Sequence, residues 1–257
     1  MYIDSHCHLD RVDLKSFNGN FADFVSDARD SGITDMLCVS IDLENYPTML
    51  ELVKPFSNIY TSVGVHPCEQ EGRDPETQEL VKLAAEPSNV AIGETGLDYF
   101  RTEGDMSWQQ QRFRRHIQAA REVNKPLIIH TREAREDTIK ILQEENADEV
   151  GGVMHCFTET WEMAQAALEL GFYISFSGIV TFKNATELKE VAKKVPIERM
   201  LIETDSPYLA PVPFRGKPNV PQYVSKVAEH IADLRETSVE EIAQQTSDNF
   251  KNLFKIN

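Results

Sequence analysis

The sequence predicts an α/β fold, a (β/α)8 TIM barrel formed by residues 1–257 as a single domain. Short apolar runs alternate eight times with helical segments, and this alternation is typical of parallel sheet because each return crossover is a helix. The runs are too short and too uniformly apolar for half-exposed antiparallel strands. The length of 257 residues is close to the roughly 250 of a closed eight-unit barrel. Eight units in this length favour the barrel over the alternative, an open doubly wound sheet.

Each predicted strand is an apolar run of strand length that is followed by polar residues, glycine or proline. These runs cover residues 2–5, 36–41, 59–65, 90–93, 127–129, 152–154, 172–176 and 200–202. In a parallel barrel the carboxyl ends of all eight strands meet on one rim, so the residues that follow the strands are expected to gather there.

The helices are predicted from apolar residues at helical spacing. Phe21, Phe24, Val25 and Ala28 form the first such stripe, and Gly32 closes that helix. Further helical segments cover residues 46–53, 76–85, 135–145, 161–170, 188–195 and 222–234.

Two more helices are predicted from their end signals. Ser107 with Gln110 predicts a capping box at the start of a long helix that Pro126 ends. Ser238 with Glu241 predicts the same kind of start for the last helix.

Composition limits the class of protein. The net charge is −16, with 42 acidic and 26 basic residues, which counts against a broad basic surface for long nucleic acid but leaves room for a nucleic-acid substrate held in one cleft. There is no 18-residue apolar run, and the first residues lack the features of a signal peptide. The four cysteines are far apart, with no CxxC motif. We therefore expect a reduced cytoplasmic protein without a disulfide framework, a membrane segment or an obligate protein partner, and we expect a monomer.

Two histidines follow the first predicted strand. In extended chain successive side chains point to opposite faces, so His6 and His8 point the same way and Cys7 points the other. Two imidazoles that converge from one strand end form half a metal site. By the same alternation we expect Cys7, and Cys156 beside His155, to be small buried hydrophobic side chains in the barrel wall.

Metal-capable residues also follow most of the other predicted strands. The full set is His6, His8, His66, Glu94, His130, His155 and Asp205. His130 and His155 are one strand–helix repeat apart, and His155 and Asp205 are two repeats apart, which is the spacing that ligands on one barrel rim require. The pattern therefore predicts a metal site, whereas His116 and His230 fall within helices and are interpreted as structural or surface residues.

The ligand types indicate the kind of metal. Four imidazoles (His6, His8, His130 and His155) and two carboxylates (Glu94 and Asp205), without an evident thiolate, suit Mg, Mn or Zn. Six ligands exceed what one tetrahedral ion takes. Two divalent ions that share a carboxylate fit better, and Glu94, midway around the rim, is the natural bridge. Such a pair can activate water and hold the oxygens of a phosphoester.

Several motifs in order resemble the TatD family of metal-dependent deoxyribonucleases, over essentially the whole chain. They are Asp4-Ser5-His6-Cys7-His8-Leu9, Gly64-Val65-His66-Pro67, Gly93-Glu94-Thr95-Gly96-Leu97-Asp98-Tyr99, Ile129-His130-Thr131-Arg132, His155-Cys156-Phe157-Thr158 and Glu203-Thr204-Asp205-Ser206-Pro207-Tyr208-Leu209.

The resemblance implies a metallo-dependent hydrolase of the amidohydrolase type with a two-metal site. It implies that His6, His8 and Asp205 bind one ion, that Glu94 bridges both, and that His130 and His155 bind the second. It also implies catalytic roles for Glu94 and Asp205, with Asp205 helping to activate water, and a contact of His66 with substrate phosphate. The implied activity is hydrolysis of DNA, as a 3′-to-5′ exonuclease on single strands.

A phosphodiesterase in an acidic chain needs local positive charge near its metals. Rim loops carry Arg101, Arg132, Lys183, Arg215 and Lys217, of which Arg132, Lys183 and Arg215 are predicted to bind substrate. Aromatic residues in the same loops, Tyr99, Phe100 and Phe182, either stack bases or pack the rim.

Two alternative functions remain at this stage. The same rim would support an amidohydrolase acting on an amide, lactone, ester or aminoacyl bond. Related two-metal amidohydrolases often use a carboxylated lysine as the bridge, and Glu94 at that place favours phosphoester chemistry. The second alternative is a metal-binding scaffold that recruits partners, which no interaction segment supports.

Overall fold

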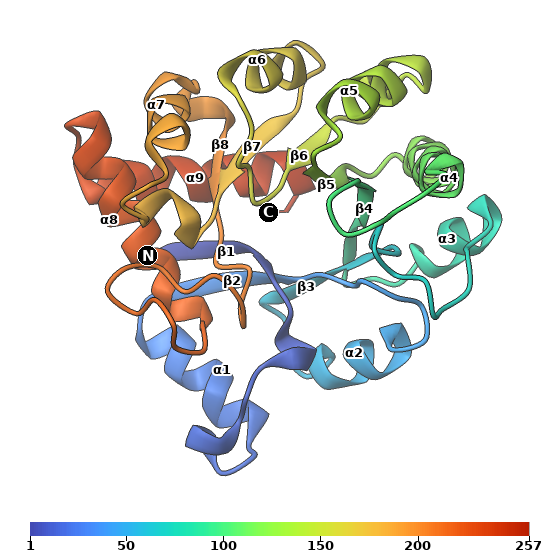
Figure 1. Ribbon diagram of the computed structural model, residues 1–257. Helices are drawn as coiled ribbons and strands as arrows, with labels where there is room; N and C mark the ends of the chain where they lie inside the picture. The colour runs from blue at the N-terminus through green and yellow to red at the C-terminus, as the bar shows by residue number, and fades with distance from the viewer. Residues whose placement is uncertain (257) are drawn as a thin grey trace.

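The computed structural model describes residues 1–256 and forms a parallel barrel (Figure 1). Eight strands pair in the order of the chain, β1 to β8. Their bounds are β1 (Tyr2–Cys7), β2 (Ile33–Cys38), β3 (Ile59–Val63), β4 (Asn89–Asp98), β5 (Leu127–Arg132), β6 (Gly152–Met154), β7 (Tyr173–Phe176) and β8 (Met200–Ile202). The predicted (β/α)8 barrel is confirmed. The open doubly wound sheet is wrong, because sequential pairing all the way round excludes its reversed strand order.

Helices surround the strands, and one further helix lies behind them (Figure 1). The surrounding helices are α1 (Phe21–Asp30), α2 (Tyr46–Val53), α3 (Thr77–Leu83), α4 (Ser107–Val123), α5 (Arg135–Glu144), α6 (Trp161–Glu169), α7 (Thr186–Lys194) and α8 (Val224–Arg235). The last helix, α9 (Val239–Phe254), holds the start of β8, where the Asn249 amide donates to the carbonyls of Ile197 and Met200 at 2.7 and 2.8 Å. In the described part of the chain no helix has the length and apolar character needed to cross a membrane.

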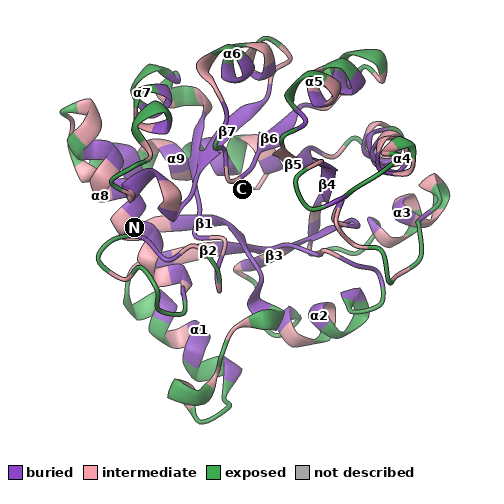
Figure 2. Ribbon diagram, viewed as in Figure 1, coloured by how far each residue is buried: buried purple, intermediate pink, exposed green. Residues whose placement is uncertain are grey.

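The core has two layers. Figure 2 shows that the strands are buried and that the outer faces of the helices are exposed. The larger layer lies between strands and helices. The smaller one fills the barrel, where Ile3, Leu37, Ile128 and Leu201 from four strands pack in one cluster with Phe250 of α9. The final helix therefore closes the barrel end that lies opposite the predicted site.

The barrel closes between its first and last strands through a short seam. The Asp205 N–H donates to the His6 carbonyl at 2.9 Å, and the His8 N–H donates to the Ser206 carbonyl at 2.8 Å. Below these bonds, the buried Asp4 carboxylate accepts the Thr204 N–H at 2.9 Å and the Thr204 hydroxyl at 2.5 Å. The seam thus fixes the backbone at the same positions that carry His6, His8 and Asp205.

Some predicted boundaries need correction. β4 and β5 run on through Asp98 and Arg132, because the polar residues after the apolar run still pair across the two strands. The predicted capping box at Ser107 is wrong. The Asp105 carboxylate accepts both the Ser107 N–H and hydroxyl, at 2.9 and 2.8 Å, and leaves no side-chain cap at the helix start. α4 also ends earlier than predicted, at Asn124 in the left-handed conformation.

Candidate metal centre

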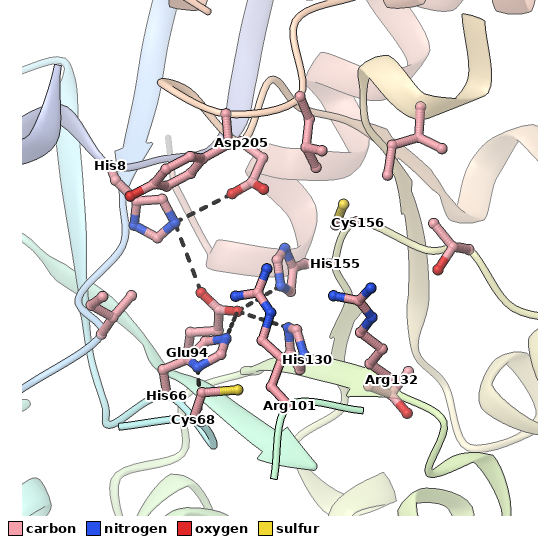
Figure 3. A pocket seen from close by; sticks show the side chains of 16 residues that line it. His8, His66, Cys68, Glu94, Arg101, His130, Arg132, His155, Cys156 and Asp205 are labelled. Carbon is pink, nitrogen blue, oxygen red and sulfur yellow. Dashed lines mark hydrogen bonds and ion pairs between the residues drawn. The ribbon is translucent and has the colours of Figure 1, made fainter. Parts of the chain in front are cut away.

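The carboxyl ends of the strands surround a cavity of about 790 Å³ (Figure 3). Its wall includes His8 after β1, His66 after β3, Glu94 on β4, His130 on β5 and His155 after β6. Asp205, after β8, completes the ring. A volume of this size falls within the roughly 300–1,000 Å³ typical of small-ligand sites. The structure therefore brings the candidate ligands of six strands to one place.

Four side chains form a first group of donor atoms. The Nε2 atoms of His6 and His8 are 3.4 Å apart, so these rings converge as the strand alternation predicts. Asp205 Oδ1 lies 3.3 Å from His8 Nε2 and 3.8 Å from His6 Nε2. Glu94 Oε2 completes the group at 3.4 Å from His6 Nε2.

A second group gathers around the other oxygen of Glu94. Its Oε1 lies 2.8 Å from His155 Nε2, 3.2 Å from His130 Nδ1 and 3.3 Å from His66 Nε2. Figure 3 shows Glu94 between the two groups. One carboxylate therefore faces a different set of ring nitrogens with each of its oxygens.

Hydrogen bonds on the far side of three rings decide which nitrogen carries the proton. His8 Nδ1–H donates to the Val39 carbonyl at 3.0 Å. His130 Nε2–H donates to Asp98 at 3.0 Å, and His155 Nδ1–H donates to Glu203 at 3.3 Å. Each bond leaves the lone pair of the other ring nitrogen directed at Glu94 or Asp205, which is the arrangement found around histidines that bind metals.

His66 has the opposite arrangement. Its Nδ1 accepts the Cys68 N–H at 3.0 Å, so in the neutral ring Nε2 carries the proton and acts as a donor. A ring nitrogen that bears a proton cannot bind a metal ion. His66 therefore presents a hydrogen-bond donor to the cavity, beside ligand-type nitrogens on its neighbours.

The charge balance of the site fits a cation. Burial raises the pKa of Glu94, but its contacts with the imidazoles of His155, His66 and His130 outweigh burial, so this pKa lies well below its usual range. Asp205 is partly exposed, and although desolvation raises its pKa, its contact with the His8 ring outweighs this and leaves the pKa below its ordinary value. Among residues 1–256 neither carboxylate has a lysine or arginine partner. Two ionised carboxylates and converging nitrogen lone pairs form a donor set that suits divalent ions.

Only some of the predicted substrate-binding residues line the cavity. Arg132, together with Arg101, lines the cavity, and its guanidinium carbon lies 3.8 Å from the centre of the Phe100 ring. Arg215 lies 4.3 Å from the Phe182 ring and, like Lys183, is not part of the cavity wall.

Tyr99 and His116 make hydrogen bonds within the protein. Tyr99 packs the rim, since its hydroxyl donates to Asp137 at 2.7 Å. His116 is structural, as interpreted from the sequence. It is buried in α4, and its Nε2 accepts the Val65 N–H at 3.0 Å.

The two cysteines beside ligands behave differently. Cys7 is buried, with its thiol on the Leu37 carbonyl, as predicted. The prediction for Cys156 is wrong, because this residue lines the cavity. β6 ends at Met154, and Cys156 adopts a φ of 43°, so strand alternation no longer applies to its side chain.

Sequence reasoning missed the two carboxylates that orient histidines. Asp98 is buried and accepts from His130, and it also accepts the N–H groups of Phe100 and Arg101. Glu203 is buried beside His155, and it accepts the Cys156 N–H at 2.7 Å and the Ser175 hydroxyl at 2.5 Å. Their positions directly at the ends of β4 and β8 were the available signal.

Comparison with known proteins supports the same grouping. A family model described as TatD related DNase matches residues 3–255. The chain is 51% identical over 255 residues to the uncharacterized metal-dependent hydrolase YcfH of Escherichia coli (strain K12), which covers 99% of this chain and 96% of that protein. It is 34% identical over 240 residues to the 3′-5′ ssDNA/RNA exonuclease TatD of Shigella flexneri serotype 5b (strain 8401), across 91% of this chain and 92% of the relative.

A solved structure agrees with these matches. The crystal structure of YJJV, a TatD homologue from Escherichia coli K12, superposes with a TM-score of 0.90 at 28% identity and covers 100% of this chain and 98% of that one. The family model and the relatives span nearly the whole chain, and the resemblance seen in the motifs is confirmed. The chain therefore belongs to the TatD family and is a metal-dependent hydrolase.

Proposed function

We propose that this protein is a phosphodiesterase that removes nucleotides from the ends of single-stranded DNA, in the manner of a 3′-to-5′ exonuclease, with two divalent ions. The observation that carries the proposal is the divided contact of Glu94, whose Oε2 faces His6 while its Oε1 faces His130 and His155. His6, His8, Asp205 and Glu94 would hold one ion, and Glu94, His130 and His155 the other. Mg, Mn and Zn are the candidate ions.

When bound, two such ions activate a water molecule and stabilise the attacking and leaving oxygens of a phosphodiester. The chain itself supplies a proton acceptor. Asp205 is the more accessible of the two carboxylates, with 13% of its side chain exposed against 3% for Glu94. Its lowered pKa keeps it ionised at neutral pH. We therefore assign Asp205 to take the proton of the attacking water and Glu94 to hold the two groups of ligands together.

The substrate phosphate is assigned to the donors that face the cavity. His66 offers Nε2–H, and the planar forks of Arg101 and Arg132 suit phosphate oxygens. Lys183 and Arg215 would meet only a strand that extends beyond the cavity wall. The recessed position of Glu94, which is 2% exposed, favours a flexible chain end over an intact duplex.

Activity assays with metal analysis would test this function. The purified protein is expected to bind two ions and to shorten single-stranded DNA from its 3′ end in the presence of Mg, Mn or Zn. Strands labelled at the 5′ or the 3′ end would give the direction. Asp205→Asn should reduce turnover more than it reduces binding of the second ion.

Two results would contradict the proposal. One is the absence of metal-dependent cleavage of single-stranded DNA, with an active nuclease as control. The other is faster turnover of uncharged amides, esters or aminoacyl compounds than of phosphodiesters, which would decide for an amidohydrolase.

A further inference from the structure

Exposed large apolar side chains are concentrated at the rim of the cavity. Apart from Met1, those within residues 1–256 are Phe100, Tyr208 and Val212, which follow β4 and β8. Large exposed apolar groups that gather at one place usually mark a binding surface. Phe100 is 55% exposed although the Arg132 guanidinium lies 3.8 Å from the centre of its ring.

Arginine side chains without acidic partners lie at the same rim. Arg101, Arg132 and Arg215 are the arginines within residues 1–256 whose guanidinium groups form neither a hydrogen bond nor an ion pair with the described chain. In a protein of net charge −16, carboxylates are plentiful enough to pair with them. Guanidinium groups that stay unpaired beside a cavity indicate an anionic ligand, and their planar fork suits phosphate.

Phe100 and Arg132 together offer an aromatic face for stacking and a guanidinium group for an anion. The Arg132 guanidinium covers part of the Phe100 ring, and Arg132 also lines the cavity. More than half of Phe100 stays open for a second flat partner. The pair Phe182 and Arg215 repeats this stacking away from the cavity wall, where it cannot meet the reacting end of a substrate.

We propose that Phe100 and Arg132 form a nucleotide subsite in which the base of an unstacked strand end lies on the Phe100 ring while Arg132 holds the adjoining phosphate. This inference rests on the proposed function and adds the feature that selects single strands. The bases of a duplex are held by pairing and stacking, whereas the base of an unpaired end can turn onto the ring without breaking a base pair. The subsite does not depend on base identity, because every base offers a flat face.

A strand that lacks bases provides the test. The measured quantity is kcat/KM for a single-stranded oligonucleotide divided by kcat/KM for the same strand with abasic tetrahydrofuran residues in its last three positions. The wild-type protein, loaded with metal, is expected to prefer the base-bearing strand by about 5- to 150-fold, the range that base–aromatic stacking provides. Phe100→Ala should bring this ratio close to one.

Three variants complete the design. Phe100→Tyr keeps a flat ring and should keep the wild-type ratio. Phe100→Leu keeps apolar volume without a flat ring, and its ratio should also fall close to one. Agreement between Phe100→Ala and Phe100→Leu would show that the change does not come from misfolding of one variant. Arg121→Gln removes an arginine on α4 that pairs with Glu149 outside the cavity, and it should leave the ratio unchanged.

A wild-type ratio near one, or an unchanged ratio in both Phe100→Ala and Phe100→Leu, would overturn the subsite and leave the exonuclease proposal standing. If the wild-type protein cleaved neither strand with any of the three metals, the proposed function would fail and the subsite with it.

Discussion

His66 and His130 lie beside each other against Glu94, with ring centres 4.5 Å apart, yet their outer hydrogen bonds give them opposite proton positions. The Cys68 N–H makes His66 a donor at Nε2, and Asp98 makes His130 a lone-pair ligand at Nδ1. Residue type alone therefore does not separate the proposed metal ligand from the proposed substrate contact, whereas the hydrogen-bond partner of each ring does.

His66→Ala is expected to lower kcat/KM for single-stranded DNA by about 10- to 150-fold, the value of one hydrogen bond to a charged group, without loss of bound metal. His130→Ala should instead lose one ion and the activity together. Metal content by mass spectrometry alongside kinetics checks both. A His66→Ala protein that binds less metal than the wild type would contradict the assigned proton position.

Asp98→Asn is expected to lower the affinity for the ion that His130 would bind by about 10- to 100-fold, because the amide no longer supports the basicity of His130. The affinity for the other ion should not change. Calorimetric titration of metal-free protein would measure both affinities. Asp137→Asn is the matched control, since Asp137 accepts from the Tyr99 hydroxyl and contacts no histidine of the two groups. An equal loss of affinity for both ions in Asp98→Asn would refute the role of Asp98 in supporting His130.

The histidines and carboxylates of the rim could be predicted from the sequence because each follows a recognisable strand. Asp98 and Glu203 also lie at strand ends, but their roles could not be predicted, because they orient His130 and His155 from behind and do not face the cavity themselves. Their roles depend on ring orientation, which no spacing rule supplies. Cys156 was misplaced for a related reason, since a backbone turn directly after β6 redirects its side chain.

At the scale of elements, α4 supports the loop that presents His66. Arg112 donates to the His66 and Glu69 carbonyls at 3.0 and 2.6 Å, and His116 accepts from Val65. The sequence predicted a long helix here from its end signals. The polar bonds from α4 to the loop after β3 need the folded geometry and could not be inferred.

The contact between His116 of α4 and Val65 in the loop after β3 is expected to depend on pH. Burial lowers the pKa of His116 to about 4, although the hydrogen bond from its Nδ1–H to the Arg112 carbonyl raises it in part. In the neutral ring its Nε2 accepts the Val65 N–H. Between pH 6.5 and 4 the unfolded chain binds a proton here that the folded protein does not, so stability falls as the pH falls.

The free energy of unfolding of the wild type is therefore expected to lose about 2 kcal/mol relative to His116→Gln between pH 7.5 and pH 5. Urea denaturation of both proteins at each pH gives the difference and removes the contribution of other titrating groups. A constant difference across this range would show that His116 is not held neutral by the fold.

At the scale of the whole molecule, stability depends on the helix that closes the barrel. Phe250 of α9 is fully buried among the strand residues inside the barrel. Phe250→Ala is expected to cost about 3–5 kcal/mol of unfolding free energy, as for other large buried rings. Lys251→Ala, on the exposed face of the same helix, should stay within about 0.5 kcal/mol of the wild type. Denaturant titration compares the three proteins.

The sequence was sufficient for the barrel and for the start of α9, where the Ser238 hydroxyl accepts the Glu241 N–H at 3.1 Å as predicted. Which surface α9 covers was not predictable, because its apolar stripe would suit either the outside or the end of a barrel. The same holds for the seam, where buried Asp4 and Thr204 complete the closure through side chains that no hydrophobic pattern identifies.

The seam between β1 and β8 has a consequence for the order of events during synthesis. His6 and His8 leave the ribosome before their partner Asp205, which follows about 200 residues later, and the bonds that fix all three form only across that seam. At a synthesis rate of roughly 5–20 residues per second, on the order of ten seconds or more pass before Asp205 is available to His6 and His8. The first group of donor atoms is thus among the last parts of the molecule to form, so a prematurely ended chain cannot complete it.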